Sequence, residues 1–271
     1  MAFRPMNESL APIRSRGNPL FRRLRALKED GAADLCLLEG PKLLEEALAS
    51  GVDVVEAAAA PRAESTERGA RVLAGLRDRG TPVRRLSDDL VAALSGAETS
   101  QGVLGMARRP AFDEEAIYRG TPLVVVAVGV QDPGNLGGLL RTAEAAGASG
   151  AYLTAGTADP FSWKALRGSM GSAFRVPHHR GLEAHEVVRR LRARGVAVLA
   201  TAGEGGRPYD RADWRRPVAL LLGREGAGLP EELLRAADER VSIPMAGRAE
   251  SLNVGVAAGI LLFEAARQRR P

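Results

Sequence analysis

The sequence predicts an α/β protein of two domains, and three observations support this prediction. The chain has 271 residues, which exceeds the roughly 100–150 residues of a typical domain. Hydrophobic residues make up 45% of it, enough to build substantial cores, and segments with strand and helix patterns alternate along its length. The pattern of apolar and polar residues changes at residue 122, where a continuously apolar run begins. We therefore place domains at 1–108 and 122–271, with a linker at 109–121.

The first 108 residues are predicted to form a small α/β sandwich. Asn18 and Pro19 are typical of an N-cap and a first helical residue, and the apolar residues after them share one helical face until Gly31. The remaining predicted elements alternate in type. They are strand 34–39, helix 41–50, strand 52–60, helix 64–79, strand 82–86, helix 88–95 and strand 102–107.

The linker and the second domain follow from a change in pattern. Residues 109–121 have mixed charge, a proline and no sustained period, which is typical of a linker. Residues 123–128 are all apolar, as expected for a parallel strand covered on both faces by helices. The further predicted elements are a helix after Asn135, strand 150–155, helix 184–194, strands 196–201 and 218–222, helix 230–237 and a terminal helix from Leu252. This order favours a mainly parallel sheet.

Two nucleotide-binding folds fit this order less well. A P-loop needs a Gly-Lys pair followed by Ser or Thr, and the sequence contains no Gly-Lys pair. A Rossmann fold needs a glycine-rich turn after the first strand and an acidic residue at the end of the second. Here the second strand ends in Thr154-Ala155-Gly156, and the richest glycine loop comes late in the chain. Because glycines also occur early, at 134–138, the Rossmann fold remains the second choice.

Positive charge is concentrated near the N-terminus. The net charge is +5, and arginine supplies nearly all of the cations. Arginine codons are also favoured in genomes rich in G and C, so the position of the cations is more informative than their number. A basic cluster, which is typical of a nucleic-acid contact, comprises Arg14, Arg16, Arg22, Arg23, Arg25 and Lys28. A solvated helix face is the alternative interpretation.

The sequence also predicts what the protein lacks. No apolar run approaches the about 18 residues of a membrane span, and residues 1–5 lack the apolar stretch of a secretory signal. Cys36, the single cysteine, cannot form an intrachain disulfide. We therefore predict a soluble, cytoplasmic protein. The only histidine cluster comprises His178, His179 and His185. The adjacent pair next to Pro177 is expected to lie in a loop, so no metal site is predicted.

Three segments place small and polar residues beside strands or helices. They are residues 131–137 (QDPGNLG) with Arg141 behind them, 223–229 (GREGAGL) and 243–258 (IPMAGRAESLNVGVAA). Asn135 is a plausible cap for its helix, and Ser251 for the last one. Glycines after an apolar strand allow a ligand to contact the backbone, and Arg141, off its helix's apolar stripe, could meet a phosphate. Turns without a ligand are the alternative.

In this order and spacing, the three segments resemble the motifs of the SpoU/TrmH family of SPOUT RNA ribose methyltransferases. More loosely, residues 15–27, Glu39-Gly40 and 99–104 (TSQGVL) are similar to a ribosomal-protein-like substrate domain. The resemblance implies an RNA substrate-binding domain at 1–108. It also implies a SPOUT domain with a trefoil knot at 122–271, which uses S-adenosylmethionine and forms a homodimer.

The resemblance further implies roles for individual residues. The implied catalytic residues are Arg141, Asn135, Glu225, Ser251 and Asn253. The implied cofactor-binding residues are Thr201, Ala202, Gly203, Leu222, Gly223, Gly228, Ile243, Met245, Ser251 and Leu252. Arg167 matches a lesser family feature and joins the basic cluster as an implied RNA contact, with a contact to the partner subunit as the alternative. The sequence departs from the family pattern at Arg224, a variable position, and at Gly255, where serine is common.

The family sometimes assigns the matching arginine as the base that removes the ribose proton. A guanidinium is not normally deprotonated in proteins, so orienting the nucleotide and stabilising oxygen charge suit Arg141 better than removing the proton. Methyl transfer from a sulfonium depends mainly on alignment and needs no metal.

The expected function is transfer of a methyl group from S-adenosylmethionine to a ribose 2′-hydroxyl of 23S rRNA. The ribosomal-protein-like first domain favours this substrate. The alternatives are tRNA, or an RNA-binding protein that has lost the chemistry.

Overall fold

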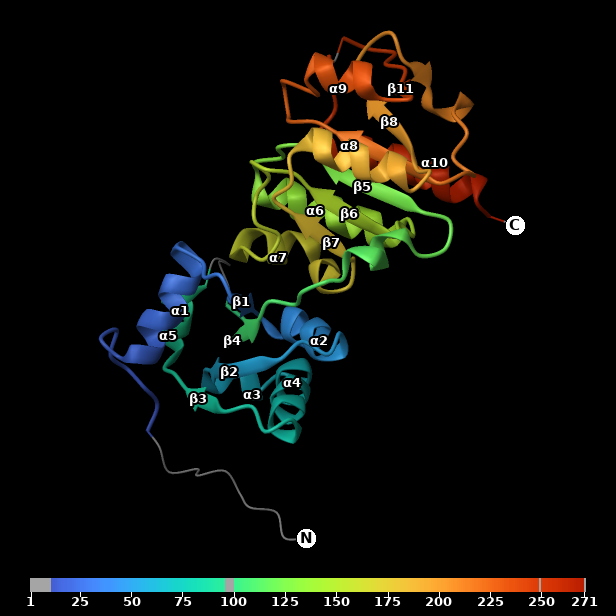
Figure 1. Cartoon of the computed structure of the whole chain (residues 1–271). Coiled ribbons are helices and arrows are strands. Elements are labelled where there is room, and N and C mark those ends of the chain that lie inside the picture. The colour runs from blue at the N-terminus through green and yellow to red at the C-terminus, as the bar shows by residue number, and fades with distance from the viewer. Residues whose placement is uncertain (1–10, 96–99, 249, 271) are drawn as a thin grey trace. The chain divides into compact units, whose positions relative to one another are not determined.

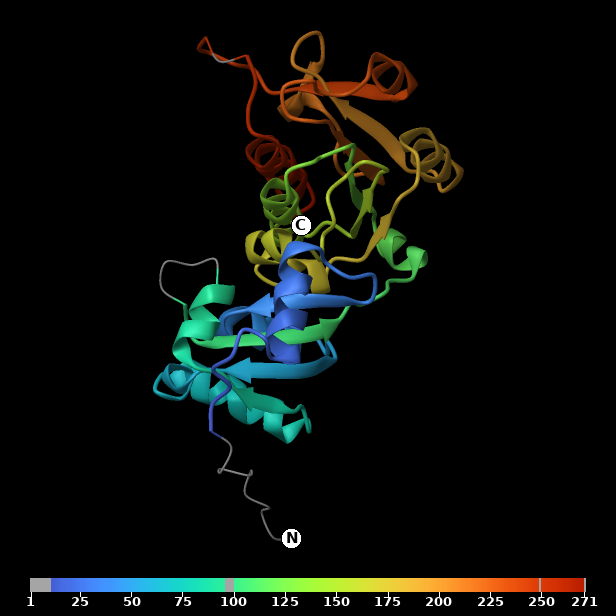
Figure 2. The same cartoon turned by 90° about the vertical axis from the view of Figure 1, so that its left-hand side faces the viewer.

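The chain folds into two compact units. A computed structural model describes residues 11–95, 100–248 and 250–270 (Figures 1 and 2). The first unit comprises residues 1–110 and 161–163, and the second comprises residues 111–160 and 164–271. Residues 1–5, Thr99 and Ala249, which entered the sequence analysis, lie outside the described residues.

The first unit is a four-stranded sheet with helices on both faces. Its elements are α1 (Pro19–Glu29), β1 (Leu35–Glu39), α2 (Pro41–Ala49), β2 (Val54–Ala59), α3 (Pro61–Glu64), α4 (Glu67–Asp78), β3 (Val83–Arg85), α5 (Asp88–Leu94) and β4 (Val103–Arg108). The strand order is β1-β4-β2-β3, with only the β2–β3 pair parallel among the described strands. Helices α1 and α5 cover one face, while α2 and α4 lie on the other (Figure 1). This confirms the predicted α/β sandwich.

The second unit is built on a seven-stranded parallel sheet. Its helices are η1 (Glu114–Tyr118), α6 (Pro133–Ala145), α7 (Trp163–Ser169), η2 (Ser172–Phe174), α8 (Ala184–Ala193), η3 (Tyr209–Arg211), α9 (Glu231–Ala236) and α10 (Val254–Gln268). Its strands are β5 (Leu123–Ala127), β6 (Gly150–Leu153), β7 (His178–Arg180), β8 (Ala197–Thr201), β9 (Arg207–Pro208), β10 (Val218–Leu222) and β11 (Glu239–Ser242). Helices α6, α7 and α10 cover one face, and α8 and α9 the other (Figure 2).

The strand order of this sheet places four loops at one edge. The order is β7-β6-β5-β10-β8-β11-β9, and every recorded pair is parallel. All residues of β5 and β10 are buried, as the apolar run at 123–128 predicts. Because neighbouring parallel strands end at the same edge, the segments after β5, β10, β8 and β11 emerge together. These segments contain most of the predicted site residues.

Several predicted elements differ from the structure. The helix predicted at 64–79 begins later, at Glu67 of α4, because the Thr66 side chain caps α4 by accepting from the Gly69 N–H at 3.1 Å; Glu64 instead ends α3, which was not predicted. The sequence pattern did not predict α7, β9 or β11. The prediction that His178 and His179 lie in a loop is wrong, because both belong to the short strand β7, which pairs with β6. The trefoil knot stays a prediction.

Most of the segment predicted as a linker lies in the second unit. Its residues 114–118 form η1, and Ile117 is completely buried in the core around β5 and β6. The Tyr152 hydroxyl donates to Glu114 at 2.5 Å, which ties η1 to β6. A single 3₁₀ turn is too short to produce a helical period, so the sequence pattern could not reveal it.

The end of α10 is held by an arginine that bonds to backbone carbonyls. The Arg269 guanidinium donates to the carbonyls of Thr121 (2.7 Å), Pro122 (3.0 Å), Trp214 (2.7 Å) and Arg216 (2.7 Å). Burial lowers the pKa of Arg269. This side chain therefore joins the C-terminal helix to the starts of β5 and β10.

Replacing Arg269 with alanine should lower the free energy of unfolding by about 2–3 kcal/mol, because four carbonyls lose a charged donor. Urea unfolding followed by circular dichroism would measure the loss. The matched control is Arg270→Ala, since the Arg270 side chain is exposed. Equal loss in the two variants would contradict an anchoring role for Arg269.

Candidate active site

The three sequence motifs meet through their polar side chains. The Asn135 amide donates to Glu225 Oε1 at 2.5 Å. The Asn253 amide donates to the same oxygen at 2.9 Å and to Asn135 Oδ1 at 3.1 Å. The three residues come from the start of α6, the loop after β10 and the start of α10. This Asn135–Glu225–Asn253 cluster therefore links segments that lie far apart in the sequence.

The N-cap of α6 fixes the position of Asn135. Asp132, not Asn135, caps this helix, and its Oδ1 accepts from the Asn135 N–H at 2.9 Å. The other carboxylate oxygen of Asp132 pairs with Lys164 Nζ at 2.6 Å. This hydrogen bond from Lys164 lowers the pKa of Asp132. The Asn135 side chain is thus left to bond across to Glu225 and Asn253.

The cap of α10 orients Asn253 in the same way. Its Oδ1 accepts from the Gly255 N–H at 2.9 Å, so its amide nitrogen faces the cluster. The prediction that Ser251 caps this helix is wrong. Asn253 is the cap because it directly precedes the first helical residue, whereas Ser251 lies two positions earlier. Ser251 lines the adjacent pocket instead.

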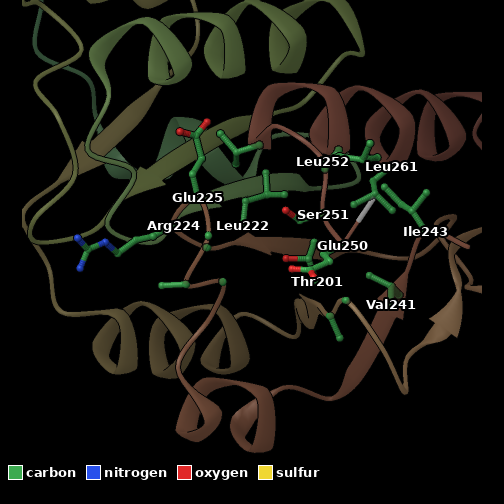
Figure 3. Close-up of a pocket in the computed structure, with 18 of the residues that line it drawn as sticks. Thr201, Leu222, Arg224, Glu225, Val241, Ile243, Glu250, Ser251, Leu252 and Leu261 are labelled. Carbon is green, nitrogen blue, oxygen red and sulfur yellow. The ribbon is translucent and has the colours of Figure 1, made fainter. Parts of the chain in front are cut away.

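A pocket of about 300 Å³ adjoins the cluster. All ten residues predicted to bind the cofactor line it, from Thr201 to Leu252. The loop after β10 contributes residues 223–228 in an unbroken run. In Figure 3, Thr201, Ser251 and Glu250 lie in the middle of the labelled residues, whereas the Arg224 side chain points away from them. The sequence analysis did not select Arg224 or Glu250.

The pocket fits a cofactor that is held by backbone and apolar contacts. Its volume lies at the lower end of the range for small-molecule sites, roughly 300–1,000 Å³. Leu222, Val241 and Leu261 supply buried apolar walls. At Gly226 and Gly228, a Cβ would meet no atom within 4 Å, so their backbone is open to a ligand. An adenine ring and a methionine chain suit such a lining.

Arg141 lies on α6, outside the residues that line the pocket. Its side chain is exposed, and no hydrogen bond or ion pair to another described residue is recorded for it. It follows Gly138 by three positions on the helix, and a Cβ at Gly138 would meet nothing within 4 Å. This face of α6 is therefore open to a large ligand.

The predicted RNA-binding arginines divide into two groups. The first group is exposed and has no ion pair with a described residue. It comprises Arg14, Arg16 and Arg22. In the second group, Arg23 pairs with Glu56 at 3.5 Å and Arg25 with Glu29 at 2.9 Å. Because acids partly neutralise the second group, the first group is better placed to meet phosphates.

The two remaining predicted RNA contacts lie on different helices. Lys28, on α1, donates to a backbone carbonyl of the first unit at 3.3 Å. Arg167 is exposed on α7, the helix that also carries Lys164.

The described part of the chain contains neither a candidate metal site nor a helix that could span a membrane. Within residues 11–95, 100–248 and 250–270, no group of three or more His, Cys, Asp or Glu residues could hold a metal ion. In the same ranges, no helix is long and apolar enough to cross a membrane. Burial lowers the pKa of His178 to about 4, so this side chain is neutral in the core.

Comparisons with known families match both units. The model of the SpoU rRNA Methylase family matches residues 122–263, and the MRM3-like substrate binding domain matches residues 19–105. The 23S rRNA (guanosine(2553)-2′-O)-methyltransferase RlmP of Bacillus subtilis is 37% identical over 244 residues, which cover 90% of this chain and 93% of that protein.

Solved structures are similar over nearly the whole chain. An rRNA methyltransferase from Sinorhizobium meliloti, solved with S-adenosylmethionine bound, is 37% identical with a TM-score of 0.83, covering 95% of this chain and 97% of that one. The SpoU methyltransferase AviRb from Streptomyces viridochromogenes, also solved with S-adenosylmethionine, is 30% identical with a TM-score of 0.82. The match covers 93% of this chain and 99% of that one. The chain therefore belongs to the SpoU rRNA methylase family.

Proposed function

We propose that this protein transfers a methyl group from S-adenosylmethionine to a ribose 2′-hydroxyl of 23S rRNA. The Asn135–Glu225–Asn253 cluster beside the glycine-lined pocket is the observation that carries this proposal. One relative that covers 90% of the chain and another that covers 67% are named as 23S rRNA guanosine 2′-O-methyltransferases. The match of residues 19–105 to the MRM3-like substrate binding domain supports a substrate-binding role for the first unit.

The cofactor supplies a methyl group on a positively charged sulfur, which makes that carbon electrophilic. The backbone of residues 223–228 and the apolar walls of the pocket would hold the cofactor. Glu225 is fixed by two amide donors, so it keeps the loop in register with α6. Arg141 orients the target nucleotide and stabilises negative charge on the ribose oxygen. Alignment of the reacting atoms supplies much of the rate.

Arg14, Arg16 and Arg22 form the RNA-contact surface of the first unit. Replacing all three by alanine should weaken RNA binding and reduce the salt slope of log K by about 2–3, since each phosphate contact contributes roughly 0.7–0.9. Filter binding of 23S rRNA at several salt concentrations would measure both quantities. Cofactor affinity should stay unchanged. An unaltered slope would place RNA recognition on the second unit.

We also propose that the protein works as a homodimer in the cytoplasm, where rRNA is modified in bacteria. Val256 and Phe263 are 52% and 48% exposed and lie seven residues apart on α10, so they share one helical face. Burying such a face against its copy would remove two large apolar side chains from water.

A charge on this face should disrupt the dimer. Phe263→Asp is expected to weaken self-association by roughly tenfold or more, because the carboxylate would be desolvated without a partner. Sedimentation velocity over a concentration series would measure it, with Arg270→Asp as the control. A wild-type chain that sediments as a monomer would refute the dimer.

Tritiated methyl transfer from S-adenosylmethionine to total RNA tests the function directly. The RNA is separated by size and digested to nucleosides. Label in a 2′-O-methyl nucleoside of the large rRNA is the expected result. Label in tRNA would keep the reaction but change the substrate. Absence of label from naked RNA and from ribosomal assembly intermediates would overturn the proposed activity.

A further inference from the structure

Two consecutive residues of the loop at 223–228, called the pocket loop below, bond to the segment at the start of α6. Glu225 accepts from the Asn135 amide, as described above. Its neighbour Arg224 sends its side chain away from the pocket (Figure 3). The guanidinium of Arg224 donates to Gln131 Oε1 at 2.6 Å. The segment 131–135 is therefore bonded at its first and last residues to one dipeptide. The Arg224 contact is independent of the Asn135–Glu225–Asn253 cluster.

The backbone around Arg224 favours this path of the side chain. Its main-chain N–H and carbonyl bond to Gly228 at 3.1 and 2.9 Å, which closes the pocket loop on itself. The arginine stem passes Gly129, where a Cβ would lie 3.3 Å from two stem carbons. Gly129 also has a positive φ of 63°, a conformation that glycine adopts without strain. The Gly129 N–H bonds to the hydroxyls of Thr154 and Thr157.

We propose that Arg224 is a positioning residue that transmits occupancy of the cofactor pocket to the start of α6. The inference rests on the proposed function, because it takes S-adenosylmethionine as the ligand of the pocket. Arg224 contributes its main chain to the pocket lining and its side chain to the segment before Asn135. When the cofactor orders the loop at 223–228, it therefore also orders the start of α6, the helix that carries Arg141.

The physical basis is the entropy of a glycine-rich loop. Three of the six residues at 223–228 are glycine, and ordering them is costly. Cofactor contacts with their backbone would restrict the loop before RNA binds. RNA that approaches α6 then meets a segment already in place, which gives positive coupling between the two ligands. Gln131 is the acceptor through which Arg224 exerts this effect.

Hydrogen exchange measured by mass spectrometry tests this, with S-adenosylhomocysteine as the added ligand. In the wild-type protein, the ligand should slow exchange in peptides covering residues 223–229 and 128–136. In Arg224→Ala, protection should persist at 223–229, whereas at 128–136 it should fall by about tenfold, as expected for loss of one charged hydrogen bond. Gln131→Ala should give the same result, and the double variant should lose no more than either single variant.

Arg235→Ala is the matched control, because Arg235 is an exposed arginine of the neighbouring helix α9 that pairs with Glu231. It should behave as wild type. RNA affinity provides a second measurement. The association constant for RNA with S-adenosylhomocysteine, divided by the constant without it, should exceed one in the wild type and approach one in Arg224→Ala.

Equal protection of 128–136 in wild type and Arg224→Ala would overturn the inference, as would its absence from the wild type. Failure of the ligand to bind the wild-type protein, measured by calorimetry, would instead refute the proposed cofactor site itself.

Discussion

Replacing Arg141 with alanine should lower kcat for methyl transfer by roughly 100- to 1000-fold, the effect of losing a donor that stabilises developing oxygen charge. The affinity for S-adenosylmethionine should change by no more than a few-fold, because Arg141 lies outside the residues that line the pocket. The exposed side chain has no recorded bond to another described residue, so its loss should leave the fold intact. Single-turnover methylation and calorimetry would measure the two quantities separately.

Two further variants sharpen this test. Arg141→Lys keeps a positive charge but lacks the planar fork, so it should recover only part of the rate if bidentate contact to a phosphate or oxygen matters. Arg189→Ala removes an exposed arginine from α8 on the other face of the sheet and should methylate normally. Normal methylation by Arg141→Ala would exclude this residue from the catalytic group.

The sequence pattern predicts the buried strands well and the short ones poorly. Strands β5 and β10 consist of continuous apolar runs, and both were predicted. The elements β7 and β9 have two or three residues, most of them polar, and such segments carry no periodicity. Pairing with a neighbouring strand creates them, and that information is not local. The split between α3 and α4 likewise depends on the Thr66 cap.

The candidate site shows the same division. Asn135, Glu225 and Asn253 could be selected because they match the motifs of the family that the sequence resembles, and because each stands among small residues beside a strand or helix. Their mutual hydrogen bonds span up to 118 positions and are visible only in the structure. Lys164 and Arg224 were not selected as site residues, because their partners Asp132 and Gln131 lie 32 and 93 positions away. A charged residue whose partner is distant has no signature in a single sequence.

Replacing Gly223 with alanine should weaken S-adenosylmethionine binding by roughly 100-fold or more, a cost of about 3 kcal/mol for overpacking against a rigid neighbour. The added Cβ would lie 2.3 Å from both the carbonyl carbon and oxygen of Gly228 and 2.6 Å from the Leu229 nitrogen. All three are backbone atoms, so no side chain can move aside. The loop must open, and its bonds between Arg224 and Gly228 would be lost. Isothermal calorimetry would measure the affinity.

Gly138→Ala is the matched control, because it makes the same chemical change on α6, where a Cβ meets nothing within 4 Å. It should bind cofactor normally and gain up to about 1 kcal/mol of stability, since alanine favours a helix over glycine. Thermal unfolding of both variants would show that the loss in Gly223→Ala is local. If Gly223→Ala unfolds like the wild type and still binds S-adenosylmethionine tightly, the closed form of the 223–228 loop is not what holds the cofactor. The apolar walls around Leu222 would then have to supply the affinity alone.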